Sequence, residues 1–149
     1  YKIPSGELTN TPLLKYIGSL NRRTILSTGM STTKEVDVAV KTLIKSGLKI
    51  KNLVILQCTS AYPTPIDELN LNTIKFLKDR YKVDVGLSDH SLGILTPIVA
   101  VALGASYIEK HFTISKDLVG PDHKASLSPN ELNVLIKNIK KIDKIIIFF

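Results

Sequence analysis

The chain has 149 residues, of which 44% are hydrophobic, and 20 Lys and Arg against 13 Asp and Glu give it a formal charge of +7. A chain of this length can bury one core and is of ordinary single-domain size. Because it has no run of 18 or more apolar residues, the sequence excludes a helical membrane span, and its first ten residues show no signal-peptide pattern.

The cysteine content and the charge pattern narrow the class of protein further. The single cysteine, Cys58, excludes an internal disulfide framework and fits a reducing cytoplasm, so we expect a cytoplasmic protein without a membrane partner. The positive charge could favour nucleic acid, an anionic membrane or a phosphorylated substrate. Its lysines are dispersed and only 6% of the residues are aromatic, so the sequence argues against a nucleic-acid partner.

Five strand-and-helix units follow one another along the chain. Each begins with a short apolar run and continues with apolar residues at helical spacing. Gly18, Gly47 and Gly104 are expected to end three of the helices, and Ser128-Pro129 to begin the last one. The expected strands cover residues 2–3, 24–26, 53–56, 83–87 and 106–108, and the expected helices cover residues 11–17, 32–46, 67–81, 94–103 and 129–145.

Apolar strands that alternate with helices predict a parallel sheet covered on both faces. Two architectures are open: a doubly wound sheet, and part of an eight-stranded (β/α)8 TIM barrel of about 250 residues. We favour a partial barrel of about five β/α units, because polar side chains follow every strand, whereas a doubly wound sheet gathers them at one switch point. Tyr1 already lies in a strand pattern, so the chain is expected to be a fragment.

Two histidines occupy equivalent positions in successive units. His90 follows the strand at residues 83–87, and His111 follows the strand at residues 106–108. A strand-helix-strand unit of this length makes neighbouring parallel strands whose carboxyl ends lie about 4.8 Å apart. The two imidazoles could therefore share one divalent metal ion, unless they are unrelated loop residues.

The other strand ends carry polar side chains as well. Each could simply cap a helix or a turn. Five sets in register instead indicate anion binding by lysine and hydroxyl groups beside the histidines, with Glu7 and Asp122 handling protons. The strand-end set comprises Lys2, Ser5 and Glu7; Ser27 and Thr28; Thr59 and Ser60; Ser88, Asp89 and His90; Lys110 and His111.

Six motifs along the chain resemble those of the sialic acid synthase family. They are KIPSGE at residues 2–7, STGM at 27–30, CTSAYP at 58–63, GLSDH at 86–90, IEKHFT at 108–113 and GPDHKASL at 120–127. The resemblance extends to about residue 142, and residues 145–149 do not match. It implies the C-terminal half of a TIM-barrel synthase domain at residues 1–149, without the N-terminal barrel units and the C-terminal antifreeze-like domain, in a parent protein that forms a homodimer.

The resemblance also implies a reaction and a set of site residues. Members condense phosphoenolpyruvate with an N-acetylated hexosamine, usually N-acetylmannosamine, to a nine-carbon sialic acid and release phosphate. His90 and His111 match the ligands of a divalent metal, typically Mn²⁺, although Mg²⁺ or Co²⁺ would suit two imidazoles too. Glu7 and Asp122 match positions that contact the sugar or transfer protons, with Glu7 our first candidate for the base. The positions that match phosphoenolpyruvate-binding residues are Lys2, Ser5, Ser27, Ser60, Tyr62 and Ser88.

The sequence is compatible with more than one substrate and with more than one role for several residues. Related enzymes make legionaminic or pseudaminic acid, so the sequence does not name the sugar, and the chain could also be an inactive binding or folding module. Asp89 and Glu109 either orient the histidines or make structural hydrogen bonds. Tyr62 either packs on the prolines beside it or contacts a ligand. We expect His123 to be a loop residue on the substrate side, and Cys58 to be a small buried group.

Overall fold

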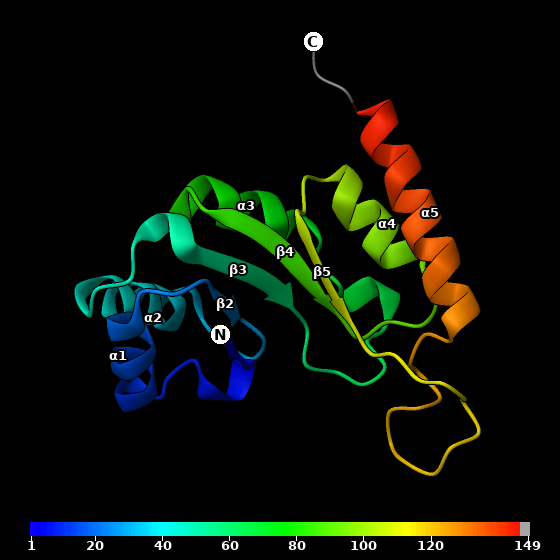
Figure 1. Ribbon diagram of the computed structural model, residues 1–149, viewed down its shortest axis with the longest axis horizontal. Helices are drawn as coiled ribbons and strands as arrows, with labels where there is room; N and C mark the ends of the chain where they lie inside the picture. The colour runs from blue at the N-terminus through cyan, green and yellow to red at the C-terminus, as the bar shows by residue number, and fades with distance from the viewer. Residues whose placement is uncertain (147–149) are drawn as a thin grey trace.

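The computed structural model describes residues 1–146, and its centre is a curved sheet of parallel strands (Figure 1). The strand order in space, β1-β2-β3-β4-β5, is the order along the chain. A doubly wound sheet would reverse direction at a switch point. The consecutive order therefore confirms the predicted partial barrel. The strands are β1 (Lys2–Ile3), β2 (Thr24–Ser27), β3 (Leu53–Cys58), β4 (Asp84–Asp89) and β5 (Tyr107–Lys110).

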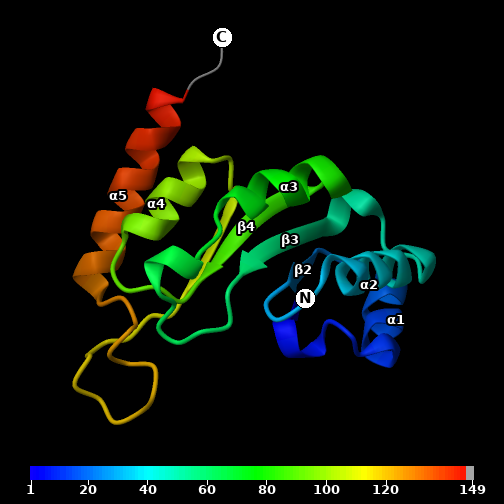
Figure 2. The same ribbon diagram turned by 180° about the vertical axis from the view of Figure 1, so that it is seen from behind.

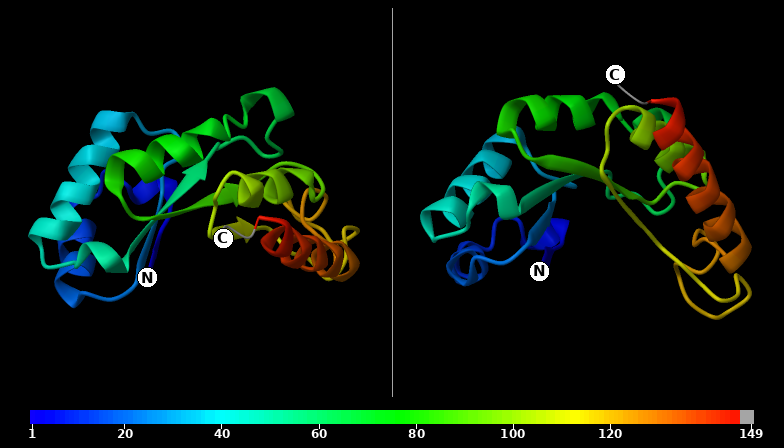
Figure 3. Two further views of the ribbon diagram at one scale, coloured as in Figure 1. Left: turned by 90° about the horizontal axis from the view of Figure 1, so that it is seen from above. Right: turned by 45° about the horizontal axis from the view of Figure 1, so that its top comes forward.

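The α-helices lie along the convex side of this sheet, as the two views in Figure 3 show. Seen from behind, α1 lies beside α2, and α4 beside α5 (Figure 2). This one-sided helix layer fits the predicted barrel, because a barrel sheet curves around its own interior and leaves only the outer side for helices. The helices are α1 (Thr11–Leu20), α2 (Thr33–Lys45), α3 (Asn72–Tyr81), α4 (Leu95–Ala102) and α5 (Pro129–Ile145), with 3-10 turns η1 (Ser5–Glu7), η2 (Ile50–Asn52) and η3 (Ile66–Glu68).

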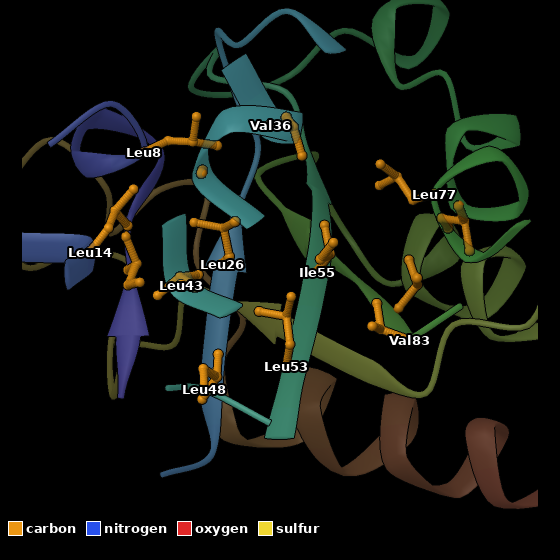
Figure 4. Packing of buried hydrophobic residues seen from close by; sticks show 14 of the residues in the cluster. Leu8, Leu14, Leu26, Val36, Leu43, Leu48, Leu53, Ile55, Leu77 and Val83 are labelled. Carbon is orange, nitrogen blue, oxygen red and sulfur yellow. The ribbon is translucent and has the colours of Figure 1, made fainter. Parts of the chain in front are cut away.

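The main core lies between the strands and the helices. Leu26 of β2 and Ile55 of β3 are fully buried there, together with Leu43 of α2 and Leu77 of α3 (Figure 4). Successive residues of a strand point to opposite faces. Residues that alternate with these apolar ones therefore face the concave side, where the strand ends can form a site.

The register of the strands aligns their carboxyl ends. Cys58 of β3 pairs with Ser88 of β4, and Asp89 of β4 pairs with Lys110 of β5. The next residues along β4 and β5 are His90 and His111. The predicted juxtaposition of the two histidines is therefore confirmed, and it follows from parallel pairing of adjacent strands.

Gly18 does not end the first helix, contrary to the prediction. Helix α1 continues to Leu20 and ends at Asn21, which adopts a left-handed conformation with φ of 47°. A Cβ atom on Gly18 would lie 2.6 Å from the carbonyl oxygen of Leu43 and 2.8 Å from the Cβ of Ser46. Gly18 therefore lets α1 approach α2 closely. Gly47 and Gly104 do follow helices as predicted, with φ of 117° and 94°.

The last helix begins where the sequence predicts. The side chain of Ser128 accepts a hydrogen bond from the amide of Glu131, and the Glu131 carboxylate accepts one from the amide of Ser128. This reciprocal cap fixes the start of α5. In the described part of the chain, every helix is too short or too polar to span a bilayer. Of the tail that does not match the family motifs, residues 147–149 lie outside the described residues.

Candidate active site

A pocket of about 360 Å³ opens at the carboxyl ends of the strands. It gathers side chains from every strand end, which confirms that the polar residues in the sequence pattern share one edge of the sheet. A larger crevice of about 750 Å³ lies next to it and shares Met30, Cys58 and Ser60 with it. The smaller pocket contains both histidines and all the predicted substrate-binding residues, namely Lys2, Ser5, Ser27, Ser60, Tyr62, Ser88, His90 and His111.

The two histidines face one another across the end of the β4 and β5 strands. Their ring centroids lie 5.4 Å apart, and the ring planes are nearly perpendicular at 81°. The Nδ1 atom of His90 lies 3.1 Å from the carbonyl oxygen of Thr59 and donates to it, which fixes the orientation of the ring. Tyr62 covers this histidine, with its ring centroid 4.0 Å away. Tyr62 is thus a pocket residue, 57% exposed to solvent.

The donor set fits a divalent metal ion. Two neighbouring imidazoles suit several first-row metals, and a carbonyl that fixes the outer ring nitrogen is a usual partner of a ligand histidine. Within residues 1–146, no group of three or more His, Cys, Asp or Glu side chains has metal-binding geometry. An ion held by His90 and His111 would thus take its other ligands from water and substrate oxygens.

The pocket favours positive charge at His90. Burial lowers the pKa of His90, but hydrogen bonds with Cys58 and the Thr59 carbonyl outweigh burial, so the pKa is raised overall. Burial raises the pKa of Cys58, but hydrogen bonds with His90 and Ser5 reverse the sign and lower it. Cys58 is 8% exposed. It is a small buried group, as predicted, and forms part of the pocket wall.

Lys2 and Glu109 form a charged pair within the pocket. The Nζ atom of Lys2 lies 2.8 Å from Oε1 of Glu109, and the Ser88 hydroxyl donates to the same oxygen at 2.7 Å. Burial raises the pKa of Glu109, but Lys2 and Ser88 outweigh burial and lower it, so the carboxylate is ionised. The sequence interpretation did not count Glu109 among the binding residues. Its position two residues before His111, on the same face of β5, was the available signal.

Hydroxyl groups line the floor of the pocket. Ser27 is 2% exposed, and its Oγ atom has no hydrogen-bond partner among residues 1–146. A buried polar atom without a partner is uncommon and indicates that a ligand or water completes it. A Cβ atom on Gly29 would lie 2.3 Å from the Oγ atom of Ser60 and 2.8 Å from that of Ser5. Gly29 therefore keeps open a cradle of hydroxyl groups that suits an anionic ligand.

The two carboxylates predicted to handle protons do not line this pocket. Glu7 accepts a hydrogen bond from the Asn10 side chain at 2.6 Å. Asp122 lies beside the site, with Oδ2 at 3.6 Å from Nδ1 of His111. The geometry thus brings Asp122, and not Glu7, against one of the histidines, while the catalytic role of each stays a prediction.

Lys110 belongs to the predicted strand-end set but does not line the pocket. Its Nζ atom lies 2.6 Å from Oδ2 of Asp89, and the two side chains are 5% and 0% exposed. Asp89 also accepts a hydrogen bond from the amide of Ser91, so its direct contacts are structural. Lys110 precedes His111 and therefore faces the opposite side of β5.

Three further residues discussed in the sequence analysis make hydrogen bonds within the protein. The Thr28 hydroxyl donates to the carbonyl of Leu56, and the Thr59 hydroxyl donates to that of Glu68. His123 lies in the loop before α5, with Nδ1 at 2.8 Å from the Thr113 hydroxyl. Its position in a loop is as predicted, and its hydrogen bond ties two parts of that loop together.

Comparisons with known proteins identify the family and agree with the fold. A family model described as the NeuB family matches residues 1–147. The N,N'-diacetyllegionaminic acid synthases of Campylobacter jejuni and Legionella pneumophila are 53% and 45% identical over 97% of the chain, which covers 43% and 41% of their lengths. The chain thus spans less than half the length of these relatives. It also superposes on an N-acetylneuraminic acid synthetase of Leptospira borgpetersenii, solved in complex with citrate, with a TM-score of 0.91 and 38% identity, covering 97% of this chain and 50% of that one.

Proposed function

The chain belongs to the NeuB family, and we propose that it supplies the phosphoenolpyruvate-binding and metal-binding part of a synthase that makes a nine-carbon sialic acid from phosphoenolpyruvate and an acetamido sugar, with release of phosphate. The observation that carries the proposal is the buried Ser27 hydroxyl, which lacks a partner among the described residues and lies in a pocket with Lys2. A phosphate or carboxylate oxygen would satisfy it.

Each pocket group has a task in this reaction. Lys2 would balance the charge of phosphoenolpyruvate, and the Ser27 hydroxyl would donate a hydrogen bond to one of its oxygens. The hydroxyls of Ser5 and Ser88 would donate to other oxygens in exchange for their present hydrogen bonds with Cys58 and Glu109. The buried strand ends would hold the enol carbon in line with the sugar aldehyde. A divalent ion, for which we propose Mn²⁺ on His90 and His111, supplies Lewis acidity where the aldehyde oxygen gains negative charge.

A carboxylate must then take a proton from the water that adds at the phosphate-bearing carbon. Glu7 and Asp122 are the two candidates. Asp122 lies beside the proposed metal site, with Oδ2 at 3.6 Å from Nδ1 of His111. Glu7 would have to exchange its hydrogen bond with Asn10 for one with that water. Tyr62, at the pocket rim, is placed to contact the sugar above His90.

We propose that the sugar carries two acetamido groups. The relatives at 53% and 45% identity are named as synthases of a diacetylated product. A nine-carbon product with two N-acetyl groups requires a six-carbon partner that brings both of them, since phosphoenolpyruvate has no nitrogen. N-acetylmannosamine, with one acetamido group, is the comparison substrate.

The test is product formation by the intact protein, assayed as phosphate release and as the mass of the nine-carbon acid. We expect faster turnover with the diacetamido sugar than with N-acetylmannosamine, and a loss of about a thousandfold in His90→Ala and in His111→Ala. Asp37→Asn, on the outer surface of α2, is the control and should keep full activity. Retained activity in both histidine variants would contradict the proposal. Binding of phosphoenolpyruvate without turnover would instead favour an inactive module.

A further inference from the structure

A buried ion pair lies behind the two histidines, on the helix side of the sheet. Lys110 and Asp89 are paired residues of β5 and β4 in the strand register. Each one directly precedes a histidine in the chain, so the histidines point into the pocket while the pair points away from it. The ion pair therefore spans the same two strand ends whose separation sets the distance between the imidazoles.

The pair holds more than two side chains together. Nζ of Lys110 lies 2.6 Å from Oδ2 of Asp89 and 2.6 Å from the carbonyl oxygen of Ser91. The other carboxylate oxygen of Asp89 accepts from the amide of Ser91 at 2.9 Å. The Ser91 hydroxyl in turn donates to Thr96 of α4 at 2.8 Å. His90 thus lies between two residues, Asp89 and Ser91, that Lys110 holds on either side.

Stability alone does not explain why this ion pair is buried. Its side chains are 5% and 0% exposed, so both charges have lost their water. Such a pair is often no better for stability than apolar residues of the same shape. What a charged pair with several hydrogen bonds provides is a fixed geometry, and a metal site tolerates little variation in the placement of its ligands.

We propose that Lys110 and Asp89 are positioning residues that set the separation and orientation of His90 and His111 for metal binding. The inference rests on the proposed function, because it needs the two histidines to share an ion. Neither residue touches the ion or the substrate. Lys110 acts on the β4 end through the Ser91 carbonyl and Asp89, and on the β5 end through its own backbone, which continues into His111.

The test compares manganese affinity with phosphoenolpyruvate affinity in the intact protein. Asp89→Asn combined with Lys110→Met removes both charges while keeping side chains of similar size. We expect the Mn²⁺ affinity, measured from the electron paramagnetic resonance signal of the free ion, to fall about tenfold or more. The affinity for phosphoenolpyruvate, measured by calorimetry in metal-free buffer, should not change.

A matched control comes from the outer surface. Asp37 and Arg80 form an ion pair between α2 and α3, with Arg80 Nη2 at 2.6 Å from Asp37 Oδ2 and no contact with either histidine. Asp37→Asn combined with Arg80→Met should leave both affinities unchanged. An equal loss of Mn²⁺ affinity in the control, or a parallel loss of both affinities in the Asp89 and Lys110 variant, would overturn the proposal.

Two further outcomes are possible: the double variant could fail to fold, and the wild-type protein could fail to bind Mn²⁺. If the neutral pair fails to fold by circular dichroism, Lys110→Arg replaces the compact ammonium by a planar fork and keeps the charge. It should fold and bind Mn²⁺ more weakly. Unchanged Mn²⁺ affinity in a folded variant, or failure of both variants to fold, overturns the inference. If the wild-type protein itself binds no Mn²⁺, the proposed function fails first, and the two failures are distinguished.

Discussion

Polar side chains lie at both ends of the parallel sheet, but the two ends differ in how completely these groups are satisfied within the described part of the protein. At the amino end, Arg23 of the β1–β2 connection bridges to Asp84 of β4 at 3.1 Å and also donates to the hydroxyl of Tyr107 on β5. At the carboxyl end, Lys2 and Glu109 form a pair as well, but the Ser27 hydroxyl lacks a partner among the described residues, and it lies in the pocket that both histidines line.

This difference between the two ends predicts that one contributes to the stability of the fold and the other to ligand binding. Arg23 and Asp84 pair with each other away from the pocket and are half exposed, so they contribute only a little to stability. Groups that are buried without a partner cost free energy in the absence of a ligand and regain it when one arrives. Substitutions at the amino end should therefore lower the stability of the fold alone, whereas substitutions at the carboxyl end should weaken ligand binding.

Replacing Lys2 should have the largest effect on ligand binding. Lys2→Met removes the lysine that lines the pocket and leaves the ionised Glu109 to repel an incoming anion. A hydrogen bond to a charged group contributes about 1.5–3 kcal/mol. We expect a loss of about fiftyfold in phosphoenolpyruvate affinity by calorimetry. An unchanged affinity would contradict the distinction between the two ends of the sheet.

Removing the Ser27 hydroxyl should weaken ligand binding less than replacing Lys2 does. Ser27→Ala deletes a group that lacks a partner among residues 1–146, so the ligand-free protein should be as stable as wild type or more stable by about 1 kcal/mol. Phosphoenolpyruvate affinity should fall about fivefold. Urea unfolding and calorimetry on the same sample check both effects. A loss of stability would show that the hydroxyl is satisfied within the protein.

The amino end should show the reverse pattern. Arg23→Met breaks an ion pair whose side chains are 51% and 53% exposed. For an exposed pair we expect a decrease of about 0.5 kcal/mol in the free energy of unfolding. Phosphoenolpyruvate affinity should be unchanged. A weakened affinity would mean that the amino end communicates with the pocket.

The smallest effect concerns acid stability in the helix layer. Hydrogen bonds from Arg80 and Tyr81 lower the pKa of Asp37 from 3.8 to about 2. Because the folded pKa is depressed, this carboxylate stabilises the fold fully above pH 3.8, and the contribution is lost as the pH falls through about 2. Melting temperatures of wild type and Asp37→Asn should therefore differ slightly at neutral pH and converge over that range. A difference independent of pH would contradict the assignment.

Much of the site follows from period-two alternation and from parallel pairing, which the sequence reveals. These rules predicted that His90 and His111 would lie side by side and that Ser27 and Ser88 would share their pocket. The same alternation, applied residue by residue, would have separated Lys110 from the site and added Glu109 to it.

Other features depend on contacts between distant elements. Position 18 has no room for a side chain because the backbone of α2 packs against it. The sequence around Gly18 does not reveal this contact. The Ser27 hydroxyl lacks a hydrogen-bond partner among residues 1–146 because of how the neighbouring strands are placed around it, which the local sequence does not reveal. The position of Asp122 beside His111 depends on how the loop before α5 folds back.

The most direct test of the proposed site is Mn²⁺ binding measured by electron paramagnetic resonance, with and without phosphoenolpyruvate. The wild-type protein is compared with a variant that combines His90→Ala and His111→Ala. We predict binding that requires the histidines and becomes tighter when phosphoenolpyruvate is present, because the ion would share the pocket with that ligand. Equal Mn²⁺ binding by both proteins, or no effect of phosphoenolpyruvate, would contradict the assignment of the carboxyl end as a joint metal and phosphoenolpyruvate site.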